Sequence, residues 1–289
     1  MRFWAEFRTR PNLPFDNTRP LRAGFPNGGG MKGRLLFLGT GASTGTPVIG
    51  CSCAVCRSDS SCNRRLRPSA LVDIGGKRLL VDCGPDFREQ ALKFGIVSLD
   101  ALFLTHHHYD HMGGVDELRV FSFGEKKEPI PCFLSEKTFE ALKQRCPYLM
   151  QPFCQDPLPW ARLEFFLLEK ERMEFQGIEI GVVRYLHKGS EVTGFCFGTL
   201  AYLPDMGAYS NGVIASLRGT EVLIADALKE EKSEAHLSLE EAIEFAKRVG
   251  AKRTYFTHIA HEMDHLKAGR RLPEKMELAY DGLEVEFSL

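Results

Sequence analysis

Residues 105–111 carry the pattern His106-x-His108-x-Asp110-His111, which places four metal-binding side chains within six positions. The apolar residues 101–104 precede this heptad and predict that it follows a strand. If the chain stays extended there, His106 and His108 point the same way, because side chains alternate along a strand. Those two can bind one ion, and Asp110 and His111 a second. A pair of ions can hold a hydroxide and polarise a phosphoryl or carbonyl oxygen, so the heptad predicts a hydrolytic metal site.

The elements that must position this heptad are predicted from apolar periodicity. Strands are expected at residues 34–38, 69–74, 78–81, 99–105, 163–168, 178–186, 195–202, 222–225 and 253–256, and helices at residues 85–94, 135–146 and 239–249. The last helix should begin after Ser238, with Glu241 completing a capping box. His187, Asp205 and His258 each lie just past the end of a predicted strand, as His106 does. Such residues can meet in loops at one edge of a sheet.

The composition is that of an ordinary globular protein. The chain has 289 residues, of which 44% are hydrophobic and 26% charged, which is enough to bury a large core. A formal net charge of -1 argues against a general polyanion-binding protein. No run of 18 apolar residues occurs, so no membrane partner is expected. Residues 1–30 are rich in Arg, Pro, Gly and Asn and are expected to form an irregular extension before a single domain at residues 31–289.

Three of the nine cysteines lie close together, as Cys51, Cys53 and Cys56. A disulfide framework explains so tight a group poorly. Metal binding in a reducing compartment explains it better, so we expect a cytoplasmic protein.

The heptad and the three later residues resemble the signature of the metallo-β-lactamase fold superfamily over residues 31–289. The resemblance implies an α/β layered fold, an αββα sandwich of two mixed β-sheets flanked by helices. It assigns His106, His108 and His187 to one ion, Asp110, His111 and His258 to the other, and Asp205 as the bridge between them. It also implies that Asp82 holds ligands in place, although a simple turn residue is the alternative there.

Within this superfamily the chain most resembles the PhnP-type phosphoribosyl cyclic-phosphate diesterases. The resemblance implies a structural zinc bound by Cys51, Cys53, Cys56 and His261. It also implies a catalytic histidine, His236, just before the late helix. The basic residues Arg64, Arg65 and Arg67 match a stretch of that group, and either phosphate steering or an ordinary solvated surface would explain them.

The predicted function is that of a metal-dependent phosphodiesterase acting on cyclic or other small phosphodiesters. Its cofactors would be two divalent ions, Zn or Mn, and one structural Zn. Asp205 would orient the attacking hydroxide, and the candidate catalytic residues are His236, as general acid, and Asp110. The sequence leaves open whether the protein forms a homodimer.

Other functions also fit parts of the sequence. A ribonuclease Z-like tRNA-processing endonuclease is not favoured, because no long basic insert is present to bind tRNA. A β-lactam or thioester hydrolase lacks support from the cysteines and His236, and a zinc- or nucleic-acid-binding protein without turnover would not need the full ligand set. The segment His261-Glu262-Met263-Asp264-His265 matches the zincin protease motif, but that motif needs a helix, which the sequence does not favour here.

Overall fold

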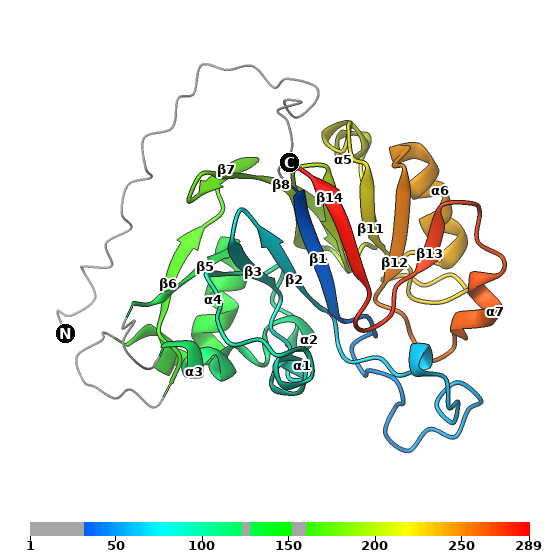
Figure 1. Ribbon diagram of the computed structural model, residues 1–289, viewed down its shortest axis with the longest axis horizontal. Helices are drawn as coiled ribbons and strands as arrows, with labels where there is room; N and C mark the ends of the chain where they lie inside the picture. Colours follow the sequence, from blue (N-terminus) through cyan, green and yellow to red (C-terminus); the bar gives the residue numbers. More distant parts are fainter. Residues whose placement is uncertain (1–31, 123–127, 152–159) are drawn as a thin grey trace.

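The computed structural model describes residues 32–122, 128–151 and 160–289. The extension expected at residues 1–30 lies outside them. Two β-sheets pack face to face, with helices on their outer sides (Figure 1). This arrangement confirms the expected αββα sandwich. None of the helices in the described ranges combines the length and apolar composition that a membrane-spanning helix requires.

The first sheet has seven strands in the order β14-β1-β2-β3-β4-β5-β6. They are β1 (Lys32–Gly39), β2 (Ser69–Ile74), β3 (Lys77–Val81), β4 (Ala101–Phe103), β5 (Ile130–Leu134), β6 (Leu163–Leu167) and β14 (Glu284–Ser288). Pairing is antiparallel from β14 to β3 and parallel from β3 to β6. The parallel half directs the carboxyl ends of β3 and β4 towards the same edge, where the heptad begins.

The second sheet has the order β13-β12-β11-β10-β9-β8-β7. Its strands are β7 (Arg172–Phe175), β8 (Ile178–His187), β9 (Ser190–Phe197), β10 (Leu200–Leu203), β11 (Val222–Asp226), β12 (Arg253–Thr257) and β13 (Met276–Leu278). Strands β10 to β13 run parallel, so the carboxyl ends of β10, β11 and β12 also share one edge.

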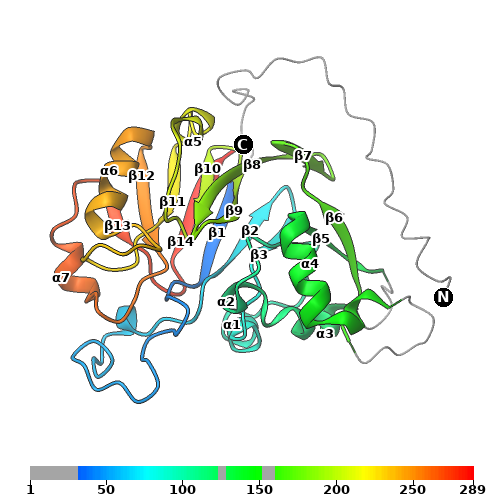
Figure 2. The same ribbon diagram turned by 180° about the vertical axis from the view of Figure 1, so that it is seen from behind.

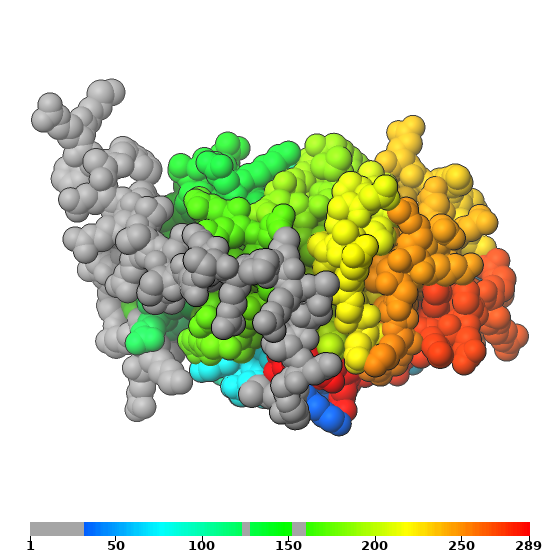
Figure 3. Space-filling model, turned by 90° about the horizontal axis from the view of Figure 1, so that it is seen from above, coloured from blue at the N-terminus to red at the C-terminus, as the bar shows by residue number. Residues whose placement is uncertain are grey.

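Helices cover the outer face of each sheet (Figure 2). The first sheet carries α1 (Phe87–Phe94), α2 (Tyr109–Met112), α3 (Arg119–Ser122) and α4 (Glu136–Arg145), and the second carries α5 (Asn211–Ser216), α6 (Leu239–Val249) and α7 (His265–Gly269). Single 3-10 turns occur at η1 (Ser61–Asn63), η2 (Val115–Leu118) and η3 (Pro147–Met150). In Figure 3 the yellow and orange segments, which include α5 and α6, lie on the right-hand side of the view.

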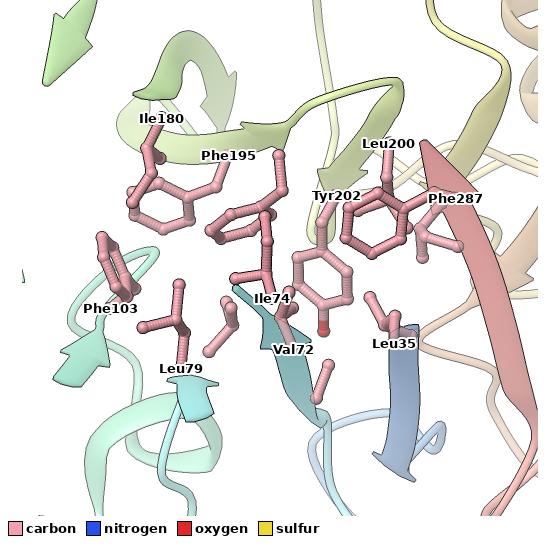
Figure 4. Close-up of a cluster of buried hydrophobic side chains, with 14 of the residues drawn as sticks. Leu35, Val72, Ile74, Leu79, Phe103, Ile180, Phe195, Leu200, Tyr202 and Phe287 are labelled. Atoms are coloured by element: carbon pink, nitrogen blue, oxygen red, sulfur yellow. The ribbon is translucent and has the colours of Figure 1, made fainter. Parts of the chain in front are cut away.

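The core between the sheets is apolar and aromatic (Figure 4). The Phe103 ring of the first sheet lies 5.3 Å from the Phe195 ring of the second, edge to face. Tyr202 and Leu79 are fully buried in the same cluster. Strands β4, β10 and β11 are buried throughout, because one face packs in this core and the other under helices, whereas β14 at the edge of its sheet alternates between exposed and buried residues.

The structure corrects one predicted strand. Residues 195–202 do not form a continuous strand, because β9 ends at Phe197 and β10 begins at Leu200 as its antiparallel neighbour. Gly198, with φ of 53°, lies in the turn between them. The apolar residues on both sides of Gly198 and Thr199 hid the reversal, since both strands are buried on both faces there. The helix at residues 239–249 and its capping box are confirmed.

Candidate metal centre

The predicted ligands converge on one edge of the sandwich, from both sheets. His106 follows β4, His187 ends β8, Asp205 follows β10 and His258 follows β12. We call these residues, with His108, Asp110 and His111, the histidine–aspartate cluster. All except the half-buried His108 have less than a tenth of their surface exposed. The edge location predicted from strand ends is therefore what the structure shows.

Asp205 lies between the two ligand sets that the sequence predicted. Its Oδ2 lies 3.1 Å from Nε2 of His106 and 3.1 Å from Nε2 of His111. Its Oδ1 lies 2.9 Å from Nε2 of His258. Asp110 completes the second set, with Oδ2 3.4 Å from Nε2 of His111 and 3.5 Å from Nε2 of His258. One carboxylate thus contacts imidazoles of both sets, as a bridging ligand must.

His187 joins the first set through its ring. The ring centroid lies 5.1 Å from that of His108 and 6.0 Å from that of His106, and the rings of His106 and His108 are 4.5 Å apart. Nδ1 of His187 lies 2.8 Å from the backbone oxygen of Ala235, to which it can donate. That bond leaves Nε2 as the nitrogen with a free lone pair, which is the form that binds a metal.

Asp82 holds the heptad from behind, which supports its predicted positioning role. Its Oδ2 lies 2.7 Å from Nδ1 of His111, and its Oδ1 accepts from the backbone N–H of Thr105 at 2.8 Å. The Thr105 hydroxyl also contacts Nδ1 of His106, at 3.0 Å. These contacts orient both imidazoles so that their Nε2 atoms face Asp205.

The buried atoms of this cluster fit divalent metal ions. Among the described residues, the buried side-chain atoms that make no hydrogen bond include Nε2 of His106, His111 and His258 and Oδ1 of Asp205, although Asp205 oxygens lie 2.9 to 3.1 Å from the three nitrogens. Buried polar groups normally make hydrogen bonds, so several neighbouring buried atoms that make none indicate a missing binding partner such as a metal ion. Burial lowers the pKa of His108 to about 3 and that of His187 to about 4, which keeps both imidazoles neutral and able to bind metal.

The charges within the cluster support the same conclusion. Burial alone would raise the pKa of Asp205, but the imidazoles of His111 and His258 hold it well below its usual range. For His258, burial acts to lower the pKa, and the neighbouring carboxylates, Asp205 foremost, overcome this and raise it to about 10. The pKa of the carboxyl is lowered and that of the imidazole is raised, because buried carboxylates are stabilised by positive charge beside them. Metal ions bound at this place would supply such charge.

His236 lies against the cluster and is 8% exposed. Its ring stacks on that of His258 at 4.7 Å and lies 4.3 Å from that of His187. Its Nδ1 is 3.3 Å from Oδ2 of Asp226, and Oδ1 of Asp226 is 3.6 Å from Nδ1 of His258. Burial raises the pKa of Asp226, and its pairing with His236 opposes that shift. His236 is therefore a buried site residue and not a surface neighbour of the α6 cap.

Sequence reasoning did not assign Asp226 to the site. The residue ends β11, between the strands that deliver Asp205 and His258, so the strand-end rule applied to it equally. Its place was hidden because it belongs to no local motif. His107, the middle histidine of the heptad, has no contact with Asp110 or Asp205 among the described interactions. Burial first, then His106, Lys137 and Arg145, lower the pKa of His107.

Cys51, Cys53, Cys56 and His261, which we call the thiol cluster, meet outside the first site. Nδ1 of His261 lies 3.4, 3.5 and 3.6 Å from the three Sγ atoms in that order. A tetrahedral zinc with bonds of about 2.3 Å to sulfur and about 2.0 Å to nitrogen separates such atoms by about 3.5 Å. The four side chains therefore fit one closed zinc site.

Backbone N–H groups also donate hydrogen bonds to the sulfur atoms of the thiol cluster, which stabilises a thiolate. The N–H groups of Val48, Cys53 and Cys56 donate to Sγ of Cys56, Cys51 and Cys53. The N–H of Cys56 and then the His261 imidazole lower the pKa of Cys53 to about 6. Cys53 is therefore largely thiolate at neutral pH, which is the form that binds zinc. Burial, in contrast, raises the pKa of Cys56 to about 11, so a zinc ion would have to displace the proton of that thiol.

The remaining motifs have structural explanations. Residues 261–264 are not helical and α7 begins at His265, so the helix that a zincin site requires is absent there. Arg65 is buried and donates to the Thr40 hydroxyl and the Ala279 carbonyl. Arg67 pairs with Asp86 at 2.6 Å. These contacts favour a structural role for Arg65 and Arg67 over phosphate steering, while Arg64 is exposed.

Comparison with known proteins defines the class to which this fold and site belong. A family model described as the beta-lactamase superfamily domain matches residues 77–259, which is more than half of the chain. The chain belongs to the β-lactamase superfamily. The strand-end histidines and aspartates described above lie within or directly beside the matched range.

A solved structure of a diphosphatase from the PhnP family gives the finer assignment. The two chains are 39% identical, the match covers 89% of this chain and 98% of that one, and the TM-score is 0.83. Within the superfamily the chain is thus a member of the PhnP family. This agrees with the resemblance carried by the thiol cluster and His236.

Curated relatives match over parts of their length. An octanoyltransferase of Porphyromonas gingivalis is 34% identical over 259 residues, which are 87% of this chain and 51% of that protein. The chain therefore spans about half the length of that relative. A ribonuclease Z of Methanosarcina mazei is 35% identical over 111 residues, covering 37% of this chain and 31% of that protein.

Proposed function

We propose that the protein is a metal-dependent phosphodiesterase that hydrolyses cyclic or other small phosphodiesters. The observation that carries this proposal is the histidine–aspartate cluster with His236 beside it. The cluster contains buried ligand atoms that make no hydrogen bond, and His236 lies beside it although it belongs to neither predicted ligand set. A site that only stored metal would not need this additional histidine, whereas a hydrolytic site can use it as an acid. The likeness to a PhnP-family diphosphatase supports phosphorus as the reacting atom.

His106, His108 and His187 would hold one divalent ion, and Asp110, His111 and His258 the other, with Asp205 shared. Zn and Mn both suit these ligands. When bound, the ions would withdraw charge from a phosphoryl group and make a nearby water acidic. Asp82 and Ala235 keep the imidazoles in the orientation that this requires, through Nδ1 of His111 and Nδ1 of His187.

His236 would act as the general acid. Its Nδ1 faces the Asp226 carboxylate, which stabilises the imidazolium and leaves the Nε2 proton for the leaving oxygen. Burial excludes bulk water from this donor. Asp205 would orient the attacking hydroxide, and Asp110, which contacts His111 and His258, is the second catalytic candidate.

The thiol cluster would hold a structural zinc. Its four ligands leave no open position for chemistry. A reducing compartment such as the cytoplasm would keep the three thiols available, so that location is part of the proposal. Neither a second copy of the chain nor a membrane is needed for the site.

A substrate panel tests the proposal against its main alternative. Protein loaded with Zn or Mn is assayed on bis-p-nitrophenyl phosphate, adenosine 2′,3′-cyclic phosphate and a tRNA precursor, each with and without EDTA. We expect EDTA-sensitive hydrolysis of the two small diesters and little cleavage of the precursor. Specific cleavage of the precursor alone would favour the ribonuclease Z-like alternative, to which the Methanosarcina relative lends some support.

A further inference from the structure

Tyr185 lies behind the histidine–aspartate cluster, in the strand that ends with His187. The two residues are two positions apart in β8, so their side chains leave the same face of the strand. Tyr185 is 3% exposed and belongs to the same buried apolar cluster as Leu203 and Met206, which lie two positions before and one position after Asp205. Its ring is therefore buried beside the segment that carries the bridging carboxylate.

One hydrogen bond joins this tyrosine to the backbone just before Asp205. The Tyr185 hydroxyl donates to the carbonyl oxygen of Pro204. Proline has no backbone N–H, so this carbonyl is the group through which hydrogen bonds can hold the residue in place. Asp205 follows with φ of 52°, a conformation that persists outside glycine only where the surrounding structure holds it. The bond thus fixes the peptide from which the Asp205 side chain projects.

The residues after Asp205 are held against the end of the same strand. The N–H of Gly207 donates to the Leu186 carbonyl at 2.9 Å. A Cβ at position 207 would clash with the Ala235 carbonyl, whose oxygen lies 2.8 Å from Nδ1 of His187. The chain is therefore held to the end of β8 on both sides of the bridging ligand, and the ligand that ends β8 is oriented at the same place.

We propose that Tyr185 is a positioning residue for the dinuclear centre, because its hydroxyl sets the direction of the carboxylate that the two ions would share. The inference rests on the metal centre of the proposed function and goes beyond the ligands themselves. Asp205 contacts imidazoles of both ligand sets, so a small rotation of its peptide would move the carboxylate relative to both ions at once. Loss of the hydroxyl should therefore weaken binding of the pair of ions and not of one ion alone.

Tyr185→Phe tests the inference, since it removes the hydroxyl and keeps the ring that packs in the apolar cluster. Protein stripped of the ions of the histidine–aspartate cluster is titrated with Mn(II), and binding is followed by calorimetry and by electron paramagnetic resonance. Two Mn(II) ions that share a bridging carboxylate are magnetically coupled, so their spectrum differs from that of isolated ions. We expect Tyr185→Phe to bind both ions about tenfold more weakly, as for a lost contact behind a ligand, and to lose much of the coupled signal even at saturation.

Tyr202→Phe is the matched control. Tyr202 is fully buried in the core between the sheets (Figure 4), and among the described residues its hydroxyl has no hydrogen-bond partner. This variant should bind Mn(II) with the wild-type affinity and show the wild-type coupled signal, although it too loses a buried phenol hydroxyl.

Wild-type affinity together with an unchanged coupled signal in Tyr185→Phe would overturn the positioning role. Equal losses in the two variants would also overturn it, because they would show a general effect of removing a buried hydroxyl. Both failures concern Tyr185 alone, since the wild-type protein would still bind two coupled ions. A wild-type protein that bound no coupled pair would instead contradict the proposed metal centre, and the inference with it.

Discussion

Asp205 is the residue on which the two predicted ligand sets depend. Its carboxylate contacts His106 and His111 through one oxygen and His258 through the other. Its backbone has φ of 52°, and His258 and Asp82 also have positive φ, at 60° and 62°. Such conformations cost about 1–3 kcal/mol each outside glycine and persist mostly where function requires them. Three of them at one sheet edge indicate that the backbone is held to aim these side chains.

His236→Ala should separate metal binding from catalysis. The imidazole is predicted to protonate the leaving oxygen and to hold no metal, so both ions should stay bound while kcat on a phosphodiester falls by about 100-fold or more. Metal analysis and steady-state kinetics on adenosine 2′,3′-cyclic phosphate, whose leaving group is an alkyl alcohol, measure the two effects.

The acid role also predicts a dependence on the leaving group. An ester whose leaving alcohol is strongly acidic needs little protonation, so His236→Ala should harm it less than an alkyl ester. Equal losses on both esters, or loss of one metal equivalent, would show that His236 is a ligand or a packing residue instead.

At the level of elements, α6 directly follows the segment that includes His236. Ser238 caps this helix: its hydroxyl accepts from the N–H of Glu241, whose side chain accepts from the Ser238 N–H. Ser238→Ala should reduce the free energy of unfolding by about 1 kcal/mol, which urea denaturation can measure. Ser210, the residue before α5, makes no such side-chain bond, so Ser210→Ala is the matched control and should have a much smaller effect.

The thiol cluster joins two segments that are far apart in sequence. Cys51, Cys53 and Cys56 belong to the loop after β1, and His261 follows His258 by three residues. His261→Ala should remove one zinc equivalent and lower the Tm by at least about 4 °C, because metal binding contributes directly to folding stability. Metal analysis and thermal unfolding measure both.

Cys62 is the control for that variant, because it lies near the cluster in η1 without joining it. Cys62→Ser should keep the zinc and nearly the wild-type Tm. A His261→Ala protein that retained a full zinc equivalent would contradict the assignment of this ligand.

Elements with a strong local signal could be predicted from the sequence. The α6 helix has both an amphipathic pattern and a capping box, and its bounds were right. The β9–β10 reversal was missed because Gly198 and Thr199 are the only interruption of the apolar residues 195–202, and two residues did not outweigh the apolar stretches on either side. Asp226 was missed for a related reason: β11 is buried throughout, and only tertiary pairing brings its last residue to His236.

At the scale of the whole molecule, the site exists because two sheets present their strand ends at one edge. The heptad comes from the first sheet, and His187, Asp205, Asp226 and His258 come from the second. Residue order along the chain predicted most of this ligand set. The contact between α4 and the β8–β9 turn, through Lys137 and Ser190, could not be predicted, because these segments become neighbours only when the sheets pack.

Metal titration of stripped protein tests the central claim most directly. Zn or Mn is added back to metal-free protein while bound metal and hydrolysis of bis-p-nitrophenyl phosphate are followed together. We predict that hydrolysis is absent at the start and reaches its maximum only when both ions of the histidine–aspartate cluster are bound, and that Asp205→Asn protein never reaches it. Full hydrolysis without metal, or a filled cluster that hydrolyses no phosphodiester, would contradict the account.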